Sequence, residues 1–193
     1  EHEISVRIVV QATLEINGHH QLKIYKSPRY GFPVAGKGND AIQSFWGASR
    51  DGGSRSHQGN DIFAPKNHPV IAVSSGRISS IRDKGLGGKQ IWIKDKTANF
   101  SQYYAHLDDW NVAKGMSVSA GDTIGFIGNT GNARSTPPHL HFGVYHHGIA
   151  IDPKPFIWKV EKLEDTEIAP QIKNPITSGF GANLRTSPSI SRE

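Results

Sequence analysis

The clearest pattern of hydrophobic and polar positions lies near the start of the chain, where residues 4–16 alternate between apolar and polar side chains. Alternation with a period of two predicts a strand with one buried and one exposed face. Asn17-Gly18 follows directly as a strong hairpin-turn signal, and Leu22 and Ile24 supply apolar positions for a returning strand. The pattern therefore predicts an N-terminal β-hairpin segment over residues 1–29.

From Tyr30 onwards, short apolar runs alternate with turns rich in glycine, proline and asparagine, such as Gly85-Leu86-Gly87-Gly88. These runs predict short strands, and no segment keeps the 3.6-residue period of an amphipathic helix. The strands are expected at residues 61–64, 69–73, 76–82, 90–94, 100–106, 123–127 and 140–145. The predicted fold class is all-β, with a compact sandwich or barrel-like core.

Composition and charge narrow the classes of protein to which the chain can belong. A length of 193 residues with 36% hydrophobic and 20% charged residues is typical of one globular domain with a small appendage. No apolar stretch reaches the length of a transmembrane helix. The net charge of +5 favours anionic partners, but no nucleic-acid-binding motif is present, so no nucleic-acid partner is predicted. The absence of cysteine restricts any zinc site to histidine and carboxylate ligands.

The triplet His139-Leu140-His141 is the strongest candidate for chemistry. Residues two apart on a strand point to the same face, so the two imidazoles are expected about 6–7 Å apart. Pro137-Pro138 favours an extended entry into this strand. One histidine can then bind a metal ion while the other accepts a proton from the attacking water. The spacing thus indicates hydrolysis by a metal-activated water, and it leaves the two histidine roles open.

Two further residues of types that suit zinc, His57 and Asp61, occur earlier in the chain. On a straight strand they would lie about 13 Å apart, too far to share one ion with bonds near 2 Å. Gly59 lies between them and permits a sharp bend. We therefore expect a bent loop that brings both side chains together at the start of the strand 61–64.

A group that stabilises charge on the attacked carbonyl should complete such a site. The candidate is His106, and strand alternation places Tyr104 on the same face. Tyr104 and Asn129 are candidate substrate contacts, with a packing or loop role as the alternative for each.

Several motifs follow one another in a fixed order between residues 32 and 158. They include Phe45-Trp46-Gly47-Ala48-Ser49-Arg50, the H-x-x-x-D motif from His57 to Asp61, Tyr104-Ala105-His106-Leu107, Gly128-Asn129-Thr130-Gly131 and the H-x-H motif from His139 to His141. Over this range the chain resembles the M23 (LytM/lysostaphin-type) zinc metallopeptidases of bacterial cell-wall metabolism. Each motif alone is weak, whereas the ordered set is highly specific.

The resemblance implies roles that spacing leaves open. It implies that His57, Asp61 and His141 hold one zinc ion, that His139 is the base, and that His106 stabilises the transition state. It also implies a peptidoglycan peptide substrate and an extracytoplasmic location, periplasmic or secreted and associated with the cell wall. The expected fold is a compact antiparallel sheet core of the duplicated-hybrid or barrel-sandwich type, with the N-terminal β-hairpin added.

The alternative function is a non-catalytic LytM-like module that binds the cell wall or activates another hydrolase. The presence of all five polar residues favours a zinc metallo-endopeptidase over this alternative. The predicted organisation places the metallopeptidase domain at residues 30–158. Residues 181–189 resemble the opening strand and loop of a bacterial SH3-like domain, so residues 159–193 are expected to be a linker and the truncated start of such a domain.

Overall fold

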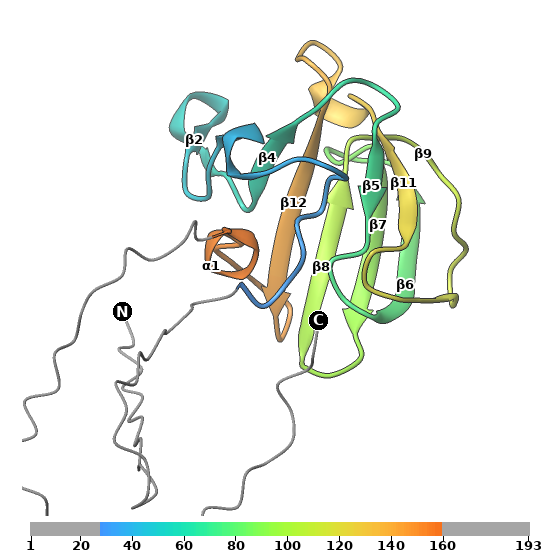
Figure 1. The fold of residues 1–193 in the computed structure, drawn as a ribbon. Coiled ribbons are helices and arrows are strands. Elements are labelled where there is room, and N and C mark those ends of the chain that lie inside the picture. Colours follow the sequence, from blue (N-terminus) through green and yellow to red (C-terminus); the bar gives the residue numbers. More distant parts are fainter. Residues whose placement is uncertain (1–27, 160–193) are drawn as a thin grey trace, which may run out of the picture. The chain divides into compact units, whose positions relative to one another are not determined.

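The computed structural model describes residues 28–159, which are the coloured part of the ribbon in Figure 1. The two strands of the predicted N-terminal hairpin and the predicted SH3-like start lie outside the described residues. Residues 28–159 form thirteen short strands, one helical turn of α-helix and three 3₁₀ turns. No helix in this part of the chain has the length and apolarity that crossing a membrane requires.

The strands are short because glycine and other turn residues interrupt the apolar runs. Their bounds are β1 (Ile42–Ser44), β2 (Ser49–Arg50), β3 (Arg55–Ser56), β4 (Asn60–Phe63), β5 (Pro69–Ile71), β6 (Gly76–Asp83), β7 (Lys89–Asp95), β8 (Phe100–Ala105), β9 (Leu107–Trp110), β10 (Ser117–Val118), β11 (Thr123–Ile127), β12 (His139–His146) and β13 (Ile149–Ile151). The helix α1 spans Lys154–Ile157, and the 3₁₀ turns span Asn39–Ala41, Asp51–Gly53 and Gly131–Ala133.

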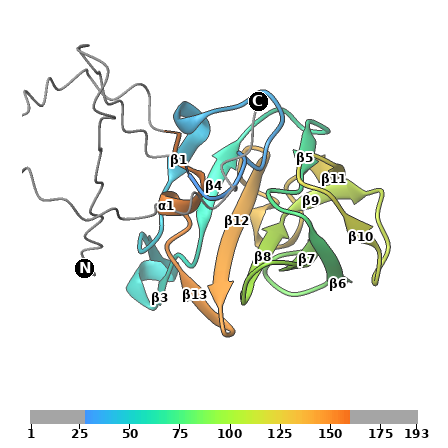
Figure 2. The ribbon, with the colours of Figure 1, turned by 60° about the horizontal axis from the view of Figure 1, so that its bottom comes forward.

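The largest sheet is antiparallel and has the strand order β1-β4-β12-β8-β7-β6-β10, with β13 paired to β12. A second sheet has the order β5-β11-β9, and β2 and β3 form a small hairpin. Figures 1 and 2 place β5, β9 and β11 together on the side of the molecule away from α1. The long strand β12 lies between β4 and β8, so these three strands, which are distant in sequence, are neighbours in the sheet.

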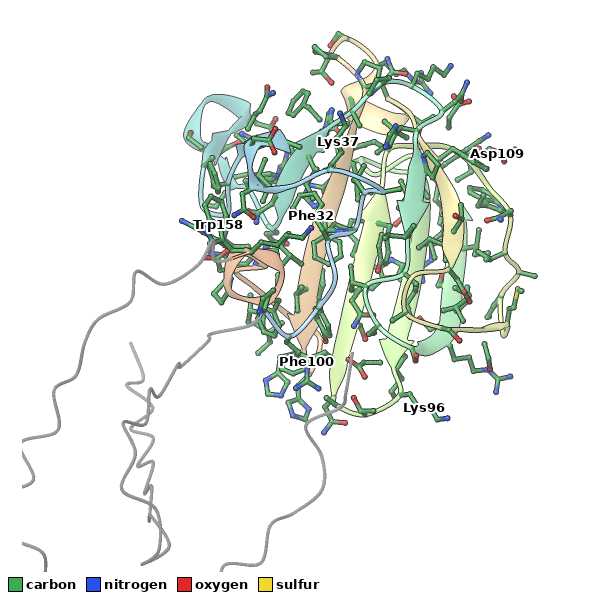
Figure 3. All side chains as sticks on the ribbon, viewed as in Figure 1. Phe32, Lys37, Lys96, Phe100, Asp109 and Trp158 are labelled. Atoms are coloured by element: carbon green, nitrogen blue, oxygen red, sulfur yellow. The ribbon has the colours of Figure 1, made fainter. Side chains whose placement is uncertain are left out.

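The core forms on one face of the large sheet, because strand residues alternate between its two faces. On β12, Leu140, Phe142 and Val144 are fully buried, and residues of the smaller sheet such as Ile124 and Ile127 complete the core. Phe32 also points into the interior, whereas Lys96 and Asp109 lie at the periphery (Figure 3). The alternate residues of β12, including His139 and His141, therefore occupy the opposite face.

The all-β prediction is confirmed, and each of the seven expected strands overlaps an observed one. The strand expected at 100–106 is wrong at its end, because β8 stops at Ala105 and His106 adopts a left-handed backbone with φ of 64°. Six short strands were not predicted, namely β1, β2, β3, β9, β10 and β13. Asp152 Oδ1 accepts the Lys154 N–H at 2.9 Å, which supports the first turn of α1.

Candidate metal centre and active site

Three side chains from two distant parts of the sequence converge on one point. His57 Nε2 lies 2.9 Å from Asp61 Oδ1 and 2.9 Å from His141 Nδ1, and Asp61 Oδ1 lies 3.0 Å from His141 Nδ1. The pairing of β4 with β12 places Asp61 directly opposite His141, which accounts for the convergence. The cluster is able to hold a metal ion.

The chemistry of the three ligand atoms fits a cation between them. Two atoms that bind one zinc ion at about 2.0–2.2 Å can lie at most about 4.4 Å apart, and all three observed separations are shorter. His57 Nδ1 donates to the Phe45 carbonyl at 2.9 Å, which leaves a lone pair on Nε2. That lone pair faces a carboxylate oxygen and a second imidazole nitrogen, an arrangement that a cation between the three atoms would stabilise.

The protonation states of the cluster suit metal binding. Burial alone would raise the pKa of Asp61, but the hydrogen bonds and charges of His141 and His57 outweigh it and hold this pKa well below its ordinary range. Burial lowers the pKa of His141, against the opposing effect of Asp61, and so favours the neutral imidazole. An ionised carboxylate and neutral imidazoles are the ligand forms that metal ions require.

Arg50 binds the second oxygen of the same carboxylate. Its Nη2 atom lies 2.9 Å from Asp61 Oδ2 and donates to Ser44 Oγ at 2.6 Å. Because Oδ2 is occupied by the guanidinium, Oδ1 is the oxygen presented to His57 and His141. Arg50 therefore fixes the orientation of Asp61 within the cluster.

The chain bends at Gly59, as expected from the spacing of His57 and Asp61. The bend does not need the left-handed backbone that glycine tolerates, since Gly59 is not among the residues with positive φ. Glycine is required for another reason: a Cβ atom there would lie 2.6 Å from the Phe142 carbonyl oxygen and 2.7 Å from His141 Nε2. The missing side chain lets the loop pass directly against the proposed metal centre.

His139 lies beside the cluster without joining it. Its Nδ1 donates to the Pro137 carbonyl at 2.9 Å, so Nε2 carries the lone pair and lies 4.0 Å from Asp61 Oδ1. The imidazole ring stacks on Phe63 with centroids 4.9 Å apart and is largely buried. This geometry presents a fixed proton acceptor next to the three ligand atoms.

His106 directly follows β8, which pairs with β12 on the side away from β4. Its ring centroid lies 5.1 Å from that of His139 and 5.8 Å from that of His141. Its Nδ1 donates to the Thr130 carbonyl at 2.9 Å, which leaves Nε2 without a proton in the neutral ring. Burial, with the charges of His141 and His139, lowers the pKa of His106 to about 4.

These side chains lie in a groove of about 530 Å³ that contains all five predicted polar residues, His57, Asp61, His106, His139 and His141. The sequence pattern did not single out Arg50, Tyr103 and Tyr145, which also line the groove. Burial raises the pKa of Tyr103 to about 12, so its hydroxyl is a neutral donor at physiological pH. Tyr103 faces the groove because it lies two residues before Ala105 on β8, and Ala105 pairs with His141.

One predicted substrate contact, Tyr104, is wrong. Tyr104 is fully buried and packs edge-on against Phe142, and its hydroxyl accepts the Val73 N–H at 3.0 Å. It differs from the prediction because the left-handed residue His106 breaks the strand alternation that put both side chains on one face. Asn129 lines a second pocket instead of the groove, and its Nδ2 approaches the Arg134 carbonyl at 3.4 Å, so its contact with substrate stays a prediction.

Comparison with known proteins gives a consistent result. Residues 55–153 match the model of peptidase family M23. The L-Ala–D-Glu endopeptidase of Bacillus subtilis is 33% identical over 147 residues, which cover 70% of this chain and 45% of that protein. The chain thus spans less than half the length of this curated relative.

Solved structures agree with the sequence matches. The catalytic domain of the antimicrobial peptidase lysostaphin from Staphylococcus simulans superposes with a TM-score of 0.51 at 34% identity, covering 67% of this chain and 91% of that domain. A zinc-containing peptidase from Vibrio cholerae gives a TM-score of 0.58 at 26% identity, covering 70% of this chain and 41% of that protein. The chain belongs to peptidase family M23.

Proposed function

We propose that this protein is a zinc-dependent endopeptidase that hydrolyses peptide bonds in bacterial peptidoglycan, in cross-links or in stem peptides. One observation carries the proposal: three ligand atoms of His57, Asp61 and His141 converge within 3.0 Å of one another beside the free Nε2 of His139. Membership of a peptidase family supports peptide-bond hydrolysis as the reaction. Peptidoglycan as substrate implies action outside the cytoplasm, in the periplasm or at the cell wall.

In the proposed site, His57 Nε2, Asp61 Oδ1 and His141 Nδ1 hold one zinc ion, with the remaining position open to water as catalytic sites require. When bound, zinc would lower the pKa of the attacking water and polarise the scissile carbonyl. Two nitrogen ligands and one carboxylate are a ligand set that catalytic zinc sites use. Arg50 keeps the carboxylate correctly oriented.

His139 acts as the general base in this proposal. Its Nε2 takes the proton of the water that attacks the carbonyl carbon, and it then gives this proton to the leaving amine as the C–N bond breaks. The hydrogen bond from Nδ1 to the Pro137 carbonyl keeps the acceptor nitrogen turned towards Asp61. The stacked ring of Phe63 restricts rotation of the imidazole.

His106 is proposed to stabilise the negative charge that develops on the carbonyl oxygen. Because Nδ1–H is committed to the Thr130 carbonyl, this contact requires a proton on Nε2. Burial disfavours the imidazolium in the resting site, and a developing negative charge nearby favours it. Tyr103 adds a neutral hydroxyl in the same groove, within reach of a bound substrate.

The alternative function is a non-catalytic module that binds the wall or activates another hydrolase. The groove argues against it, since the proposed base and the second catalytic histidine are both held by backbone hydrogen bonds next to the ligand cluster. A binding module has no need for such fixed ring nitrogens. A basic surface alone does not favour a nucleic-acid partner.

Digestion of purified peptidoglycan tests the proposal. The protein should release new amino groups, a chelator should abolish the release, and added zinc should restore it. A His57→Ala variant provides the matched control for metal dependence. Mass analysis of the fragments identifies the bond cut. Equal release by chelator-treated and untreated protein would refute the mechanism, and absence of release by the zinc-loaded protein would favour the non-catalytic alternative.

A further inference from the structure

Two loops hold His106, one through its backbone and the other through its imidazole ring. One loop precedes β7 and provides the Gly87 carbonyl, which accepts the His106 N–H at 2.9 Å. The other follows β11 and provides the Thr130 carbonyl, which accepts His106 Nδ1–H at 2.9 Å. His106 thereby keeps a left-handed backbone, with φ of 64°, that a residue with a side chain rarely adopts.

The two loops are packed against each other too closely to admit side chains at their contact. A Cβ atom on Gly88 would come within 2.6 Å of Thr130 and Gly131 atoms, and one on Gly131 would come within 2.5 Å of Leu86 and Gly88 atoms. The Asn132 N–H also donates to the Leu86 carbonyl at 3.0 Å. The carbonyl that binds His106 therefore belongs to a rigid contact between loops.

The hydroxyl of Thr130 anchors this contact in two directions. It donates to the Leu107 carbonyl at 2.9 Å and accepts the Lys89 N–H at 2.9 Å. Leu107 follows His106 directly, and Lys89 begins β7. The Thr130 side chain thus links its loop to the backbone of Leu107 and to the start of β7. The hydroxyl uses its proton for one hydrogen bond and a lone pair for the other.

A neutral imidazole carries one proton, and the partner of one nitrogen decides which nitrogen has it. A carbonyl oxygen can only accept, so its fixed position opposite Nδ1 selects the Nδ1–H form of His106. If the carbonyl rotated away, both ring forms would be populated. Nε2, the nitrogen that is not bound to the backbone, would then be protonated in part of the molecules.

We propose that Thr130 is a positioning residue for His106, and that its hydroxyl holds the Thr130 carbonyl in place, selects the Nδ1–H form and leaves Nε2 available to the groove. The proposal rests on the proposed function for its effect on turnover. The ring form of His106 does not depend on that function, so it provides a separate test. Thr130 touches neither the ligand cluster nor the proposed base, and it acts only through His106.

The test compares Thr130→Val, which removes the hydroxyl at similar size, with Thr130→Ser, which keeps it. Thr97→Val is the matched control, because it removes a hydroxyl that donates to Asp95 at 2.9 Å, outside the groove. Proton–nitrogen NMR correlations of the His106 ring in the zinc-loaded protein report which nitrogen is protonated. Zinc content, kcat and KM on peptidoglycan fragments are measured for the same samples.

We expect wild type, Thr130→Ser and Thr97→Val to keep a protonated Nδ1, and Thr130→Val to show a mixture of ring forms. Its kcat should fall about tenfold or more, with zinc content and KM unchanged, because a ring released from the Thr130 carbonyl is no longer held in the orientation that its contact with the reacting carbonyl needs. A Thr130→Val protein with a fully protonated Nδ1 would overturn the proposal, as would a Thr130→Ser protein with the same defect. Should Thr130→Val fail to fold, Thr130→Ala takes its place with the same expectations. If the wild-type protein lacks peptidase activity, the protonated nitrogen of His106 seen by NMR still tests the role of Thr130.

Discussion

Three of the four histidines in the groove use one ring nitrogen to bind the backbone. His57 donates to the Phe45 carbonyl, His106 to the Thr130 carbonyl and His139 to the Pro137 carbonyl, each through Nδ1 at 2.9 Å. The protonated nitrogen is thereby fixed, and Nε2 of each ring is left for a metal ion or a proton. The backbone, more than the neighbouring side chains, sets the chemistry of these residues.

Replacing the proposed base separates catalysis from metal binding. We expect His139→Ala to bind zinc as wild type does, because no ligand atom of the cluster belongs to His139. Turnover should fall about 10²–10⁴-fold, the usual contribution of a positioned general base. Zinc content by mass spectrometry and hydrolysis of peptidoglycan check both parts. A variant that lost its zinc would instead make His139 a ligand and exchange its role with that of His141.

Arg50 should affect metal affinity without touching the ion. We expect Arg50→Gln to weaken zinc binding about 10–100-fold, because Asp61 Oδ2 loses the guanidinium that orients the carboxylate. Arg55→Gln is the control, since Arg55 lines the same groove but pairs with Asp51. Competition with a chelating dye measures both affinities. Equal zinc affinity of Arg50→Gln and Arg55→Gln would contradict the role given to Arg50.

Residue types and spacing predict all four histidines of the groove and Asp61, but they do not predict which tyrosine faces the groove. Tyr104 was expected there from strict strand alternation, and Tyr103 occupies the position instead. The cause is the left-handed backbone of His106, which reverses the side-chain direction between β8 and the histidine. A positive φ at a residue other than glycine has no clear signature in a single sequence.

At the scale of elements, the register between β4 and β12 makes the site. Asp61 pairs with His141, and His139 pairs with Phe63, which stacks on its ring. A slip of one residue would turn every side chain of one strand to the other face and separate the ligands. The apolar alternation of β12 prevents this slip, because Leu140, Phe142 and Val144 must stay in the core.

Gly59 is the residue at which this arrangement is most easily broken. We expect Gly59→Ala to lose zinc binding, because the added Cβ would lie 2.6 Å from a backbone oxygen of β12 and 2.7 Å from the His141 ring. Gly31→Ala is the matched control, since nothing lies within 4 Å of its Cβ position and its φ is not positive. Zinc titration of both proteins, with circular dichroism for folding, makes the comparison. Full zinc affinity in Gly59→Ala would mean that the loop does not pass this close.

The longer strands could be predicted from the sequence, whereas most of the short ones could not. Runs such as 123–127 carry a clear apolar pattern and match β11 at both ends. Strands of two residues, such as β2 and β10, have too few positions for any period, and they form by pairing with the unpaired backbone groups of a neighbouring strand. The pairing order of the sheet depends on contacts between distant segments, which local patterns do not contain.

At the scale of the whole molecule, buried tyrosine hydroxyls join the two sides of the core. Tyr30 donates to Asp95 Oδ2 at 2.9 Å, and Tyr104 accepts the Val73 N–H at 3.0 Å. Burial raises the pKa of Tyr30 to about 12, helped by Asp95, and it also raises the pKa of Tyr104. These neutral hydroxyls therefore contribute to stability throughout the physiological pH range.

The raised pKa values give the stability a defined dependence on pH. Because both folded-state values lie above the ordinary value near 10, the contribution is complete below pH 10 and is lost as the pH rises from 10 towards 12. We expect the urea midpoint to fall over this window. Tyr104→Phe should reduce that fall, yet cost about 1–3 kcal/mol at pH 8, because the Val73 N–H loses its partner. A Tyr104→Phe protein with the wild-type pH profile would contradict this assignment.

The central claim is that His57, Asp61 and His141 bind one zinc ion in the groove. Anomalous X-ray scattering from zinc-loaded crystals, recorded above and below the zinc absorption edge, tests it most directly. We expect a single strong peak per chain, at bonding distance from His57 Nε2, Asp61 Oδ1 and His141 Nδ1. A peak coordinated by other residues, or no peak in crystals of protein that hydrolyses peptidoglycan, would contradict it.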